Sequence, residues 1–151
     1  MLRQQLTEAL KVALKAREAR AVSTLRLILA ALKDRDIAAR PKGNTEGIDD
    51  AEIIELLHRM VRQRRESIGL FEQGGRLELA QQEAEEIAVI ERFLPKQLDE
   101  AATDAAVSEM IAALGAGSLK DMGRVMTALK ENYGGQMDFG RASQIVKQKL
   151  G

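Results

Sequence analysis

The chain has 151 residues, of which 45% are hydrophobic and 30% charged, a composition typical of a globular rather than a disordered protein. It contains no cysteine, which excludes disulfides and thiolate metal sites. Three Phe, one Tyr and no Trp leave few rings for stacking nucleobases. The 23 basic and 23 acidic residues cancel, so the chain as a whole is a poor non-specific nucleic-acid binder.

The charge is unevenly spread along the chain. Residues 1–42 carry 10 basic and 4 acidic side chains, whereas residues 43–91 carry 5 and 12. We interpret this asymmetry as basic and acidic helices that pack side by side and screen one another. No apolar stretch approaches the roughly 20 residues of a membrane-spanning helix, and the N-terminal segment lacks the apolar run of a secretory signal. We therefore expect no membrane association and a cytoplasmic location.

Apolar residues recur at helical spacing almost throughout, and no window alternates as a strand does, so we predict an all-α fold. Residues 21–39 leave so little polar face that this helix is expected at the centre of a bundle. The apolar positions of the first two helices are Leu2, Leu6, Leu10, Ala13 and Leu14, followed by Leu25, Leu27, Ile28, Leu29 and Leu32.

A loop with Pro41 and Gly43 precedes a third helix, for which Asp49 or Asp50 is a suitable N-cap. This helix is expected to end at Gly74 and Gly75, and the fourth helix to follow. The buried positions expected here are Ile53, Ile54, Leu57, Met60, Val61, Ile68 and Phe71, then Leu77, Ala80, Ala84, Ile87 and Ile90.

Charged residues on these two helices have a simple interpretation. Arg59, Arg62, Arg64 and Arg65 could contact phosphate, but we favour an ion-paired face in which Glu55 and Glu66 of the same helix are their partners. The acidic Glu83, Glu85 and Glu86 lack the loop glycine of a calcium site and are expected to face solvent.

Pro95 excludes helical geometry at Leu94 and divides the chain. We predict an N-terminal four-helix bundle-like module over residues 1–94, a hinge at 95–98, and a small C-terminal three-helix module over 99–151. Asp99 is the expected cap of the fifth helix, which Gly115 and Gly117 terminate.

The last third of the chain contains the clearest helix start and stop signals. Ser118 and Asp121 have capping-box spacing. Gly134 and Gly135 are expected to supply the positive φ that ends the sixth helix, and Asp138 to cap the seventh. The expected buried stripes are Leu119, Met122, Val125, Met126 and Leu129, then Phe139, Ala142, Ile145 and Val146.

Several short motifs here resemble one known family. They are the Asp-Met-Gly-basic-Val-Met run at 121–126, the Gly-x-x-Asp step at 135–138 and the Val-Lys-x-x-Leu ending at 146–150. The segments at 23–27 and 93–98 add two N-terminal landmarks. Together they resemble the YqeY family and the homologous tail domain of GatB, a subunit of the amidotransferase that acts on mischarged Asp-tRNA or Glu-tRNA.

The resemblance implies a partner rather than a reaction. In the amidotransferase the tail domain is implicated in holding tRNA, so the expected partners are tRNA or an amidotransferase complex. The RNA-binding candidates are Lys120, Arg124, Lys130 and Arg141, with Gly123, Gly134 and Gly135 as places of close backbone approach. Many relatives have Lys or Arg between the glycine and aspartate of the turn; this chain has Gln136 and Met137 instead, which weakens a phosphate contact there.

No catalytic constellation is visible in the sequence. His58 is the only histidine, with no nucleophile at a useful spacing, and Asp138-Phe139-Gly140 matches the kinase tripeptide only by coincidence. We expect no cofactor, no metal and no activity by the chain alone, although homology implies a carbon–nitrogen ligase that uses glutamine as amido-N-donor. The alternative to an RNA-binding accessory is a helical protein–protein adaptor without a nucleic-acid role.

Overall fold

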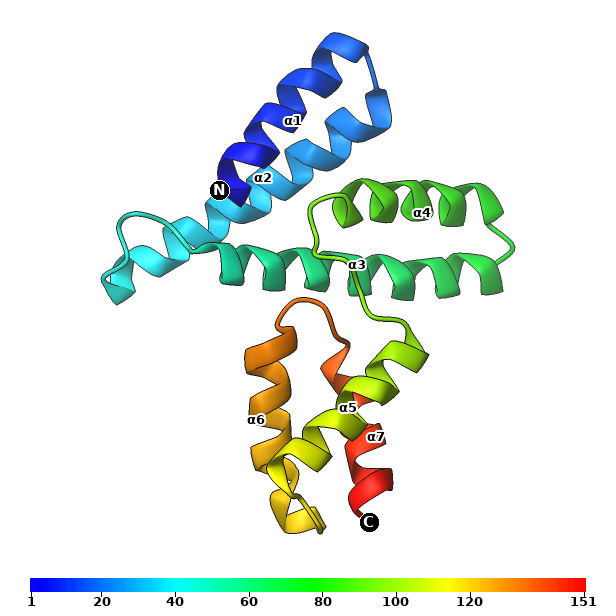
Figure 1. Cartoon of the computed structure of the whole chain (residues 1–151). Coiled ribbons are helices and arrows are strands. Elements are labelled where there is room, and N and C mark those ends of the chain that lie inside the picture. The colour runs from blue at the N-terminus through cyan, green and yellow to red at the C-terminus, as the bar shows by residue number, and fades with distance from the viewer. The chain divides into compact units, whose positions relative to one another are not determined.

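The computed structural model describes residues 1–151 and confirms the all-α prediction (Figure 1). The chain divides into two compact units, Met1–Leu94 and Pro95–Gly151. The helices are α1 (Leu2–Ala16), α2 (Ala19–Ala39), α3 (Asp50–Gln73), α4 (Leu77–Glu91), α5 (Glu100–Leu114), α6 (Met122–Tyr133) and α7 (Phe139–Leu150), with short 3-10 turns η1 (Arg40–Lys42) and η2 (Leu119–Asp121). None of the helices is both long and apolar enough to cross a membrane.

The first unit consists of two helical hairpins, α1 with α2 and α3 with α4 (Figure 1). Helix α2 also packs on α4 and, over a short stretch, on α3, so it joins the two hairpins as its apolar composition predicts. The core of the first unit is built around the fully buried side chains of Leu6, Leu25, Ile28, Ile53, Leu57 and Ile90.

Three leucines assigned to this core are exposed, as is Ala84 of α4, whose predicted burial is also wrong. Leu14, Leu27 and Leu77 have 46%, 49% and 66% of their surface accessible, so their predicted burial is wrong. Each lies just outside the stripe that its helix turns toward its neighbours, where periodicity alone does not separate a core position from a border position. Thr24, on the other hand, is completely buried and its hydroxyl has no hydrogen-bond partner.

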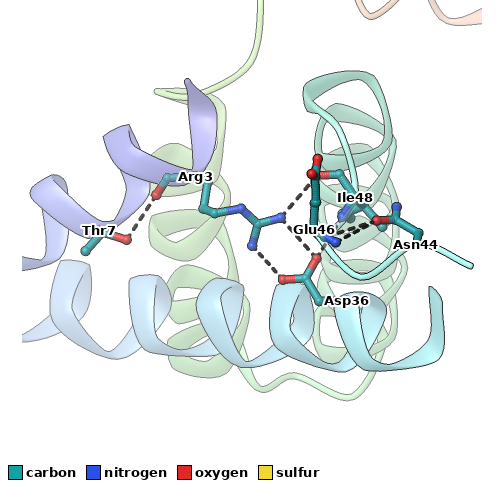
Figure 2. Close-up of polar contacts among 7 residues, drawn as sticks. Arg3, Thr7, Asp36, Asn44, Glu46 and Ile48 are labelled. Atoms are coloured by element: carbon teal, nitrogen blue, oxygen red, sulfur yellow. Dashed lines mark hydrogen bonds and ion pairs between the residues drawn. The ribbon is translucent and has the colours of Figure 1, made fainter. Parts of the chain in front are cut away.

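One carboxylate connects three segments of the first unit (Figure 2). Asp36, near the end of α2, receives two hydrogen bonds from the Arg3 guanidinium of α1, with N–O distances of 2.5 and 3.0 Å. Its Oδ1 also accepts from the Ile48 amide at 2.9 Å, and Arg3 donates to the Ile48 carbonyl at 3.1 Å. We call these three residues the Arg3–Asp36 lock.

The lock fixes the loop between α2 and α3. Asn44 supports the same turn, because its side-chain oxygen accepts from the amides of Glu46 and Gly47 at 3.2 and 3.0 Å (Figure 2). Gly47 has φ +101°, and a Cβ at this position would lie 2.6 Å from the Arg3 Nη2 and 2.9 Å from the Asp36 Oδ1. Only glycine therefore allows the backbone to pass beside the ion pair.

The start of α3 carries two aspartates with separate roles. Asp49 is its N-cap, as one of the two predicted candidates, and accepts from the Glu52 amide at 2.9 Å. Asp50 instead accepts from the Leu2 amide at 3.3 Å, so it provides an acceptor to the first turn of α1. Such an anion at a helix N-terminus is favourable because it offsets the unpaired amides there.

A second polar cluster joins α3 to α4 and corrects two predictions. Arg64 pairs with Glu86 at 2.9 Å and lies 3.9 Å from Glu83, with Arg64 and Glu86 only 13% and 10% exposed. The expected solvent-facing position is therefore wrong for Glu86. Burial, with the nearby Glu86, raises the pKa of the Glu83 carboxyl.

The predicted ion pairs within α3 are also absent. Arg64 and Arg65 pair with glutamates of α4, Arg65 with Glu91 at 3.8 Å, while Arg59 and Arg62 make no ion pair. The partners come from the neighbouring helix because the two helices pack along their length, which places long side chains opposite one another.

The second unit packs α5, α6 and α7 around its own core. Asp99 and Asp138 cap α5 and α7 as predicted, accepting from Ala102 at 2.7 Å and from Gly140 at 3.0 Å. Ser118, however, makes no side-chain cap bond, and Leu119 is 48% exposed rather than buried. The most buried apolar residues are Val107, Val125, Leu129, Ala142, Ile145 and Val146.

The turn between α6 and α7 holds the start of the second unit. Gly135 has the predicted positive φ, 79°, but Gly134 has φ −54°, so the positive-φ prediction is wrong there. The Leu98 amide donates to the Gln136 carbonyl at 2.8 Å, and the Gln97 side chain donates to the Gly135 carbonyl. The neighbouring Met137 is only 4% exposed and completes the core.

We expect Asp36→Asn to destabilise the protein by about 1–3 kcal/mol, because it removes one charge of a half-buried pair and leaves the other unbalanced. Hydrogen bonding from Arg3 holds the Asp36 pKa below its ordinary value, against the opposing effect of burial. A lowered folded-state pKa stabilises the fold above about pH 4, and this contribution disappears as the pH falls through the folded value. Urea unfolding of both proteins from pH 7 to pH 3 should therefore show a difference that shrinks below about pH 4.

Two controls complete this experiment. Gly47→Ala should destabilise the same loop at every pH, since it displaces the lock sterically and strains a positive φ. Asp34→Asn lies two residues away, on an exposed position without an ion pair, and should change stability by less than about 0.5 kcal/mol. A pH-independent effect of Asp36→Asn would contradict the assigned role of its charge.

We propose that residues 95–98 act as a hinge, and limited trypsin digestion tests this. The first cut should follow Lys96, which is exposed and lies next to the boundary between the two compact units. Cleavage after Lys42 should be slow in the wild type, because the lock holds the following turn, and faster in Asp36→Asn. Mass spectrometry of early fragments identifies both sites; protection of Lys96 would indicate one fused domain.

Candidate nucleic-acid interface

The sequence-predicted basic residues lie at three places in the second unit. Lys120 is exposed on η2 and Arg124 is exposed in the first turn of α6. Arg124 donates to Asp121 at 3.2 Å, so part of its charge is already balanced within the fold. Lys120 has no such partner. The fold thus leaves Lys120 as the uncompensated charge at this end of α6.

Asp121 has a different role from the one its spacing predicts. Its carboxylate accepts from the Gly117 amide at 3.0 Å, one residue before Ser118, and so ties the loop before η2 to the start of α6. Hydrogen bonding from the Gly117 backbone is the main reason that the Asp121 pKa is lowered, with the charge of Arg124 a smaller cause. The first turn is therefore organised around the Asp121 carboxylate, and Lys120 and Arg124 are the basic residues beside it.

Lys130 and Arg141 do not extend this cluster. Lys130 is exposed in the last turn of α6, six residues after Arg124, which rotates it by about 240° to another face of the helix. Arg141 is engaged within the fold: its Nε donates to Glu100 at 3.1 Å and its Nη1 to Gln144 at 3.1 Å. Its guanidinium joins α7 to α5 and has limited capacity for a further ligand.

A shallow groove of about 430 Å³ runs along α6 next to Arg124, and we call it the α6 groove. It is lined by Gly123, Thr127, Ala128 and Glu131 of α6 together with Leu114 at the end of α5. Gly123 and Arg124 belong to the motif at 121–126, whereas the other lining residues belong to no motif and could not be identified from the sequence.

Gly123 has no structural requirement for glycine. It is helical, it is absent from the positive-φ residues, and a Cβ built on it would meet no atom within 4 Å. Glycine inside a helix costs roughly 1 kcal/mol relative to alanine, so the fold alone would favour a side chain here. The missing side chain leaves backbone exposed at the edge of the α6 groove, where a ligand can approach closely. Gly134 differs, because a Cβ there would lie 3.0 Å from the Lys130 carbonyl.

The basic N-terminal segment is only partly screened by the acidic segment that follows it. Between them the fold provides one pair of side chains, Arg20 with Glu85 at 3.2 Å, besides the amino terminus near Asp50. The predicted mutual screening is therefore incomplete. The basic residues of α1, α2 and η1 that make no ion pair include Lys11, Lys15, Arg26, Lys33, Arg35 and Arg40.

The structure offers no metal centre: no group of three or more His, Cys, Asp or Glu side chains is arranged to hold an ion. His58 lies half-buried on α3. The class defined by these observations is a two-unit, all-helical protein with exposed basic residues and glycines.

Comparison with known families gives the class a name. The family model YqeY, described as Yqey-like protein, matches residues 3–150. The chain therefore belongs to the YqeY family, which confirms the resemblance found in the motifs. A search of curated proteins found no match.

Proposed function

We propose that this protein is a non-catalytic accessory that binds tRNA, or the complex of a tRNA with an amidotransferase, through the α6 end of its second unit. Membership of the YqeY family is the reason for proposing tRNA as the partner. The single observation that supports this binding site is Gly123, an exposed helical residue where the fold would accommodate a side chain but the sequence has glycine. Lys120 and Arg124 flank it and supply positive charge.

The chemistry of this surface suits weak binding to a phosphate backbone. Lys120 provides an unpaired ammonium group, and Arg124 can exchange its contact with Asp121 for a phosphate oxygen. Amides at the start of a helix also favour anions. Two or three phosphate contacts imply a modest affinity with a marked salt dependence. Arg141 is not a primary contact of this interface, since Glu100 and Gln144 occupy its donors.

We expect the double change Lys120→Glu with Arg124→Glu to abolish tRNA binding, measured by fluorescence anisotropy with bulk tRNA at two salt concentrations. The wild-type affinity should itself fall about tenfold over a modest rise in salt, for two or three contacts. Circular dichroism should show unchanged helical content, because both side chains are exposed and lie outside the core of the second unit.

A matched control separates a site from diffuse charge. Lys15→Glu with Arg62→Glu makes the same change in net charge, at exposed positions of α1 and α3 without ion pairs. It should leave tRNA binding nearly intact. Equal loss in both variants would indicate diffuse electrostatics, and absence of wild-type binding at low salt would favour the adaptor function.

Gly123→Ala tests the close approach directly. Alanine should stabilise α6 by up to about 1 kcal/mol, since it fits the space and the helical φ. The same methyl group should weaken tRNA binding by interposing itself between the backbone and the ligand. Increased stability together with unchanged affinity would place the ligand elsewhere.

The second candidate function, a protein–protein adaptor, is favoured by a different observation. Several large aliphatic side chains are exposed on the helices of the first unit, Leu27 and Leu70 among them. Leucine does not recognise phosphate, so such positions suit a protein partner. We expect no ATP-dependent conversion of Glu-tRNA to Gln-tRNA by the chain alone. Turnover that survives repurification would overturn the non-catalytic assignment.

A further inference from the structure

A groove of about 570 Å³ lies between α2 and α3 in the first unit, and we call it the α2–α3 groove. The two helices contact each other only over a short stretch, so their facing sides leave this space open. The apolar residues that line it are Leu27, Ala31 and Ala38 of α2, and Leu56 and Met60 of α3. Leu56 and Met60 are 5% and 7% exposed, whereas Leu27 is 49% exposed. The groove thus has an apolar floor with a large aliphatic side chain at its edge.

Arginines stand beside this floor without internal partners. Arg35 of α2 and Arg59 of α3 line the groove, and neither makes an ion pair or a side-chain hydrogen bond. Their neighbour Arg64 is different, because Glu83 and Glu86 already neutralise it. Asp34 is the only acidic residue in the lining.

A second basic stripe lies on another side of α2. Arg26 and Lys33 are seven residues apart, with Arg40 of η1 seven residues further on, and all three are exposed without an ion pair. They do not line the groove, so the positive charge that an occupant meets directly comes from Arg35 of α2 and Arg59 of α3.

We propose that the α2–α3 groove binds an amphipathic helix from an acidic protein partner. A helix with leucine-like residues at i, i+3, i+4 and i+7 places one apolar stripe on the floor, and flanking Glu or Asp residues pair with Arg35 and Arg59. RNA fits less well, because the floor is aliphatic and no aromatic side chain lines the groove. This site is separate from the α6 groove and does not rest on tRNA binding.

The experiment uses the full chain, uniformly labelled with ¹⁵N, and a synthetic peptide of about 18 residues, which forms about five helical turns. The probe carries Leu on one helical stripe and Glu on both sides of it. Two control peptides have the same Leu positions with Lys in place of Glu, or the same composition in scrambled order. Amide shifts should change on addition of the probe at the groove-lining positions of α2 and α3, and neither control should reproduce them.

Matched variants test the two parts of the surface. Leu27→Glu should weaken probe binding by about tenfold or more, and Leu77→Glu, an exposed leucine outside the groove, should not. Arg59→Glu should weaken it likewise, while Arg62→Glu, an exposed arginine of the same helix outside the lining, should have little effect. Both groove positions are exposed, so the variants should remain folded.

Several outcomes would overturn the proposal. They are no shift with the acidic probe, shifts confined to other elements, or equal binding of the scrambled peptide. Concentration-dependent shifts of the same residues without peptide would assign the groove to a second copy of the chain, and displacement of the probe by tRNA from these residues would assign it to RNA.

Discussion

The course of the chain in the first unit depends on the carboxylate of Asp36. This carboxylate, on α2, accepts hydrogen bonds from the Arg3 guanidinium of α1 and from the Ile48 amide in the loop between α2 and α3. One acceptor thus connects three segments of the chain. Because these hydrogen bonds fix the loop, they also fix the position at which α3 begins. The α2–α3 groove is bounded by two helices whose connection is held by polar contacts, and its floor, Leu56 and Met60, belongs to the apolar core that holds the hairpins together.

Electrical neutrality of the whole chain conceals a clear local order. Four glutamates of α4 form ion pairs within the fold: Glu83, Glu85, Glu86 and Glu91 lie opposite arginines of α2 or α3. Arg3 and Arg20 are paired, but the other basic side chains of α1 and α2 make no ion pair. Because each ion pair removes one charge of either sign, the molecule stays neutral as a whole, and its excess of positive charge is local to α1 and α2. A partner that contacts these two helices meets a more positive surface than the composition of the whole chain implies.

Helix positions and most caps were predictable because they follow from local chemistry. Asp49, Asp99 and Asp138 each precede an apolar run and cap it as expected, since capping needs only a short side chain beside its own helix. Ser118 does not cap because a 3-10 turn replaces the expected first helical turn, and in it the Asp121 amide donates to the Ser118 carbonyl rather than to the Ser118 hydroxyl. Local spacing cannot rank two competing acceptors.

Contacts between helices could not be predicted from the sequence. Periodicity marks an apolar stripe but not its width, which is why Leu27 and Leu119 are exposed and Met137 is buried. The partners of Arg64 were missed because they lie on another helix about 20 residues later. For the candidate interface, the motif located Lys120, Gly123 and Arg124, whereas only the structure reveals that Arg141 is engaged by Glu100 and that Gly123 borders a groove.

The division of the core residues has a consequence for synthesis of the protein. Every residue of the first core cluster precedes Pro95, and every residue of the second follows it. The ribosome therefore delivers a complete set of core side chains for one unit before it begins the other, and domains fold as units in this order during translation. The first unit can therefore bury its apolar side chains before the second unit is synthesised. This shortens the time during which the nascent chain exposes apolar surface and can aggregate.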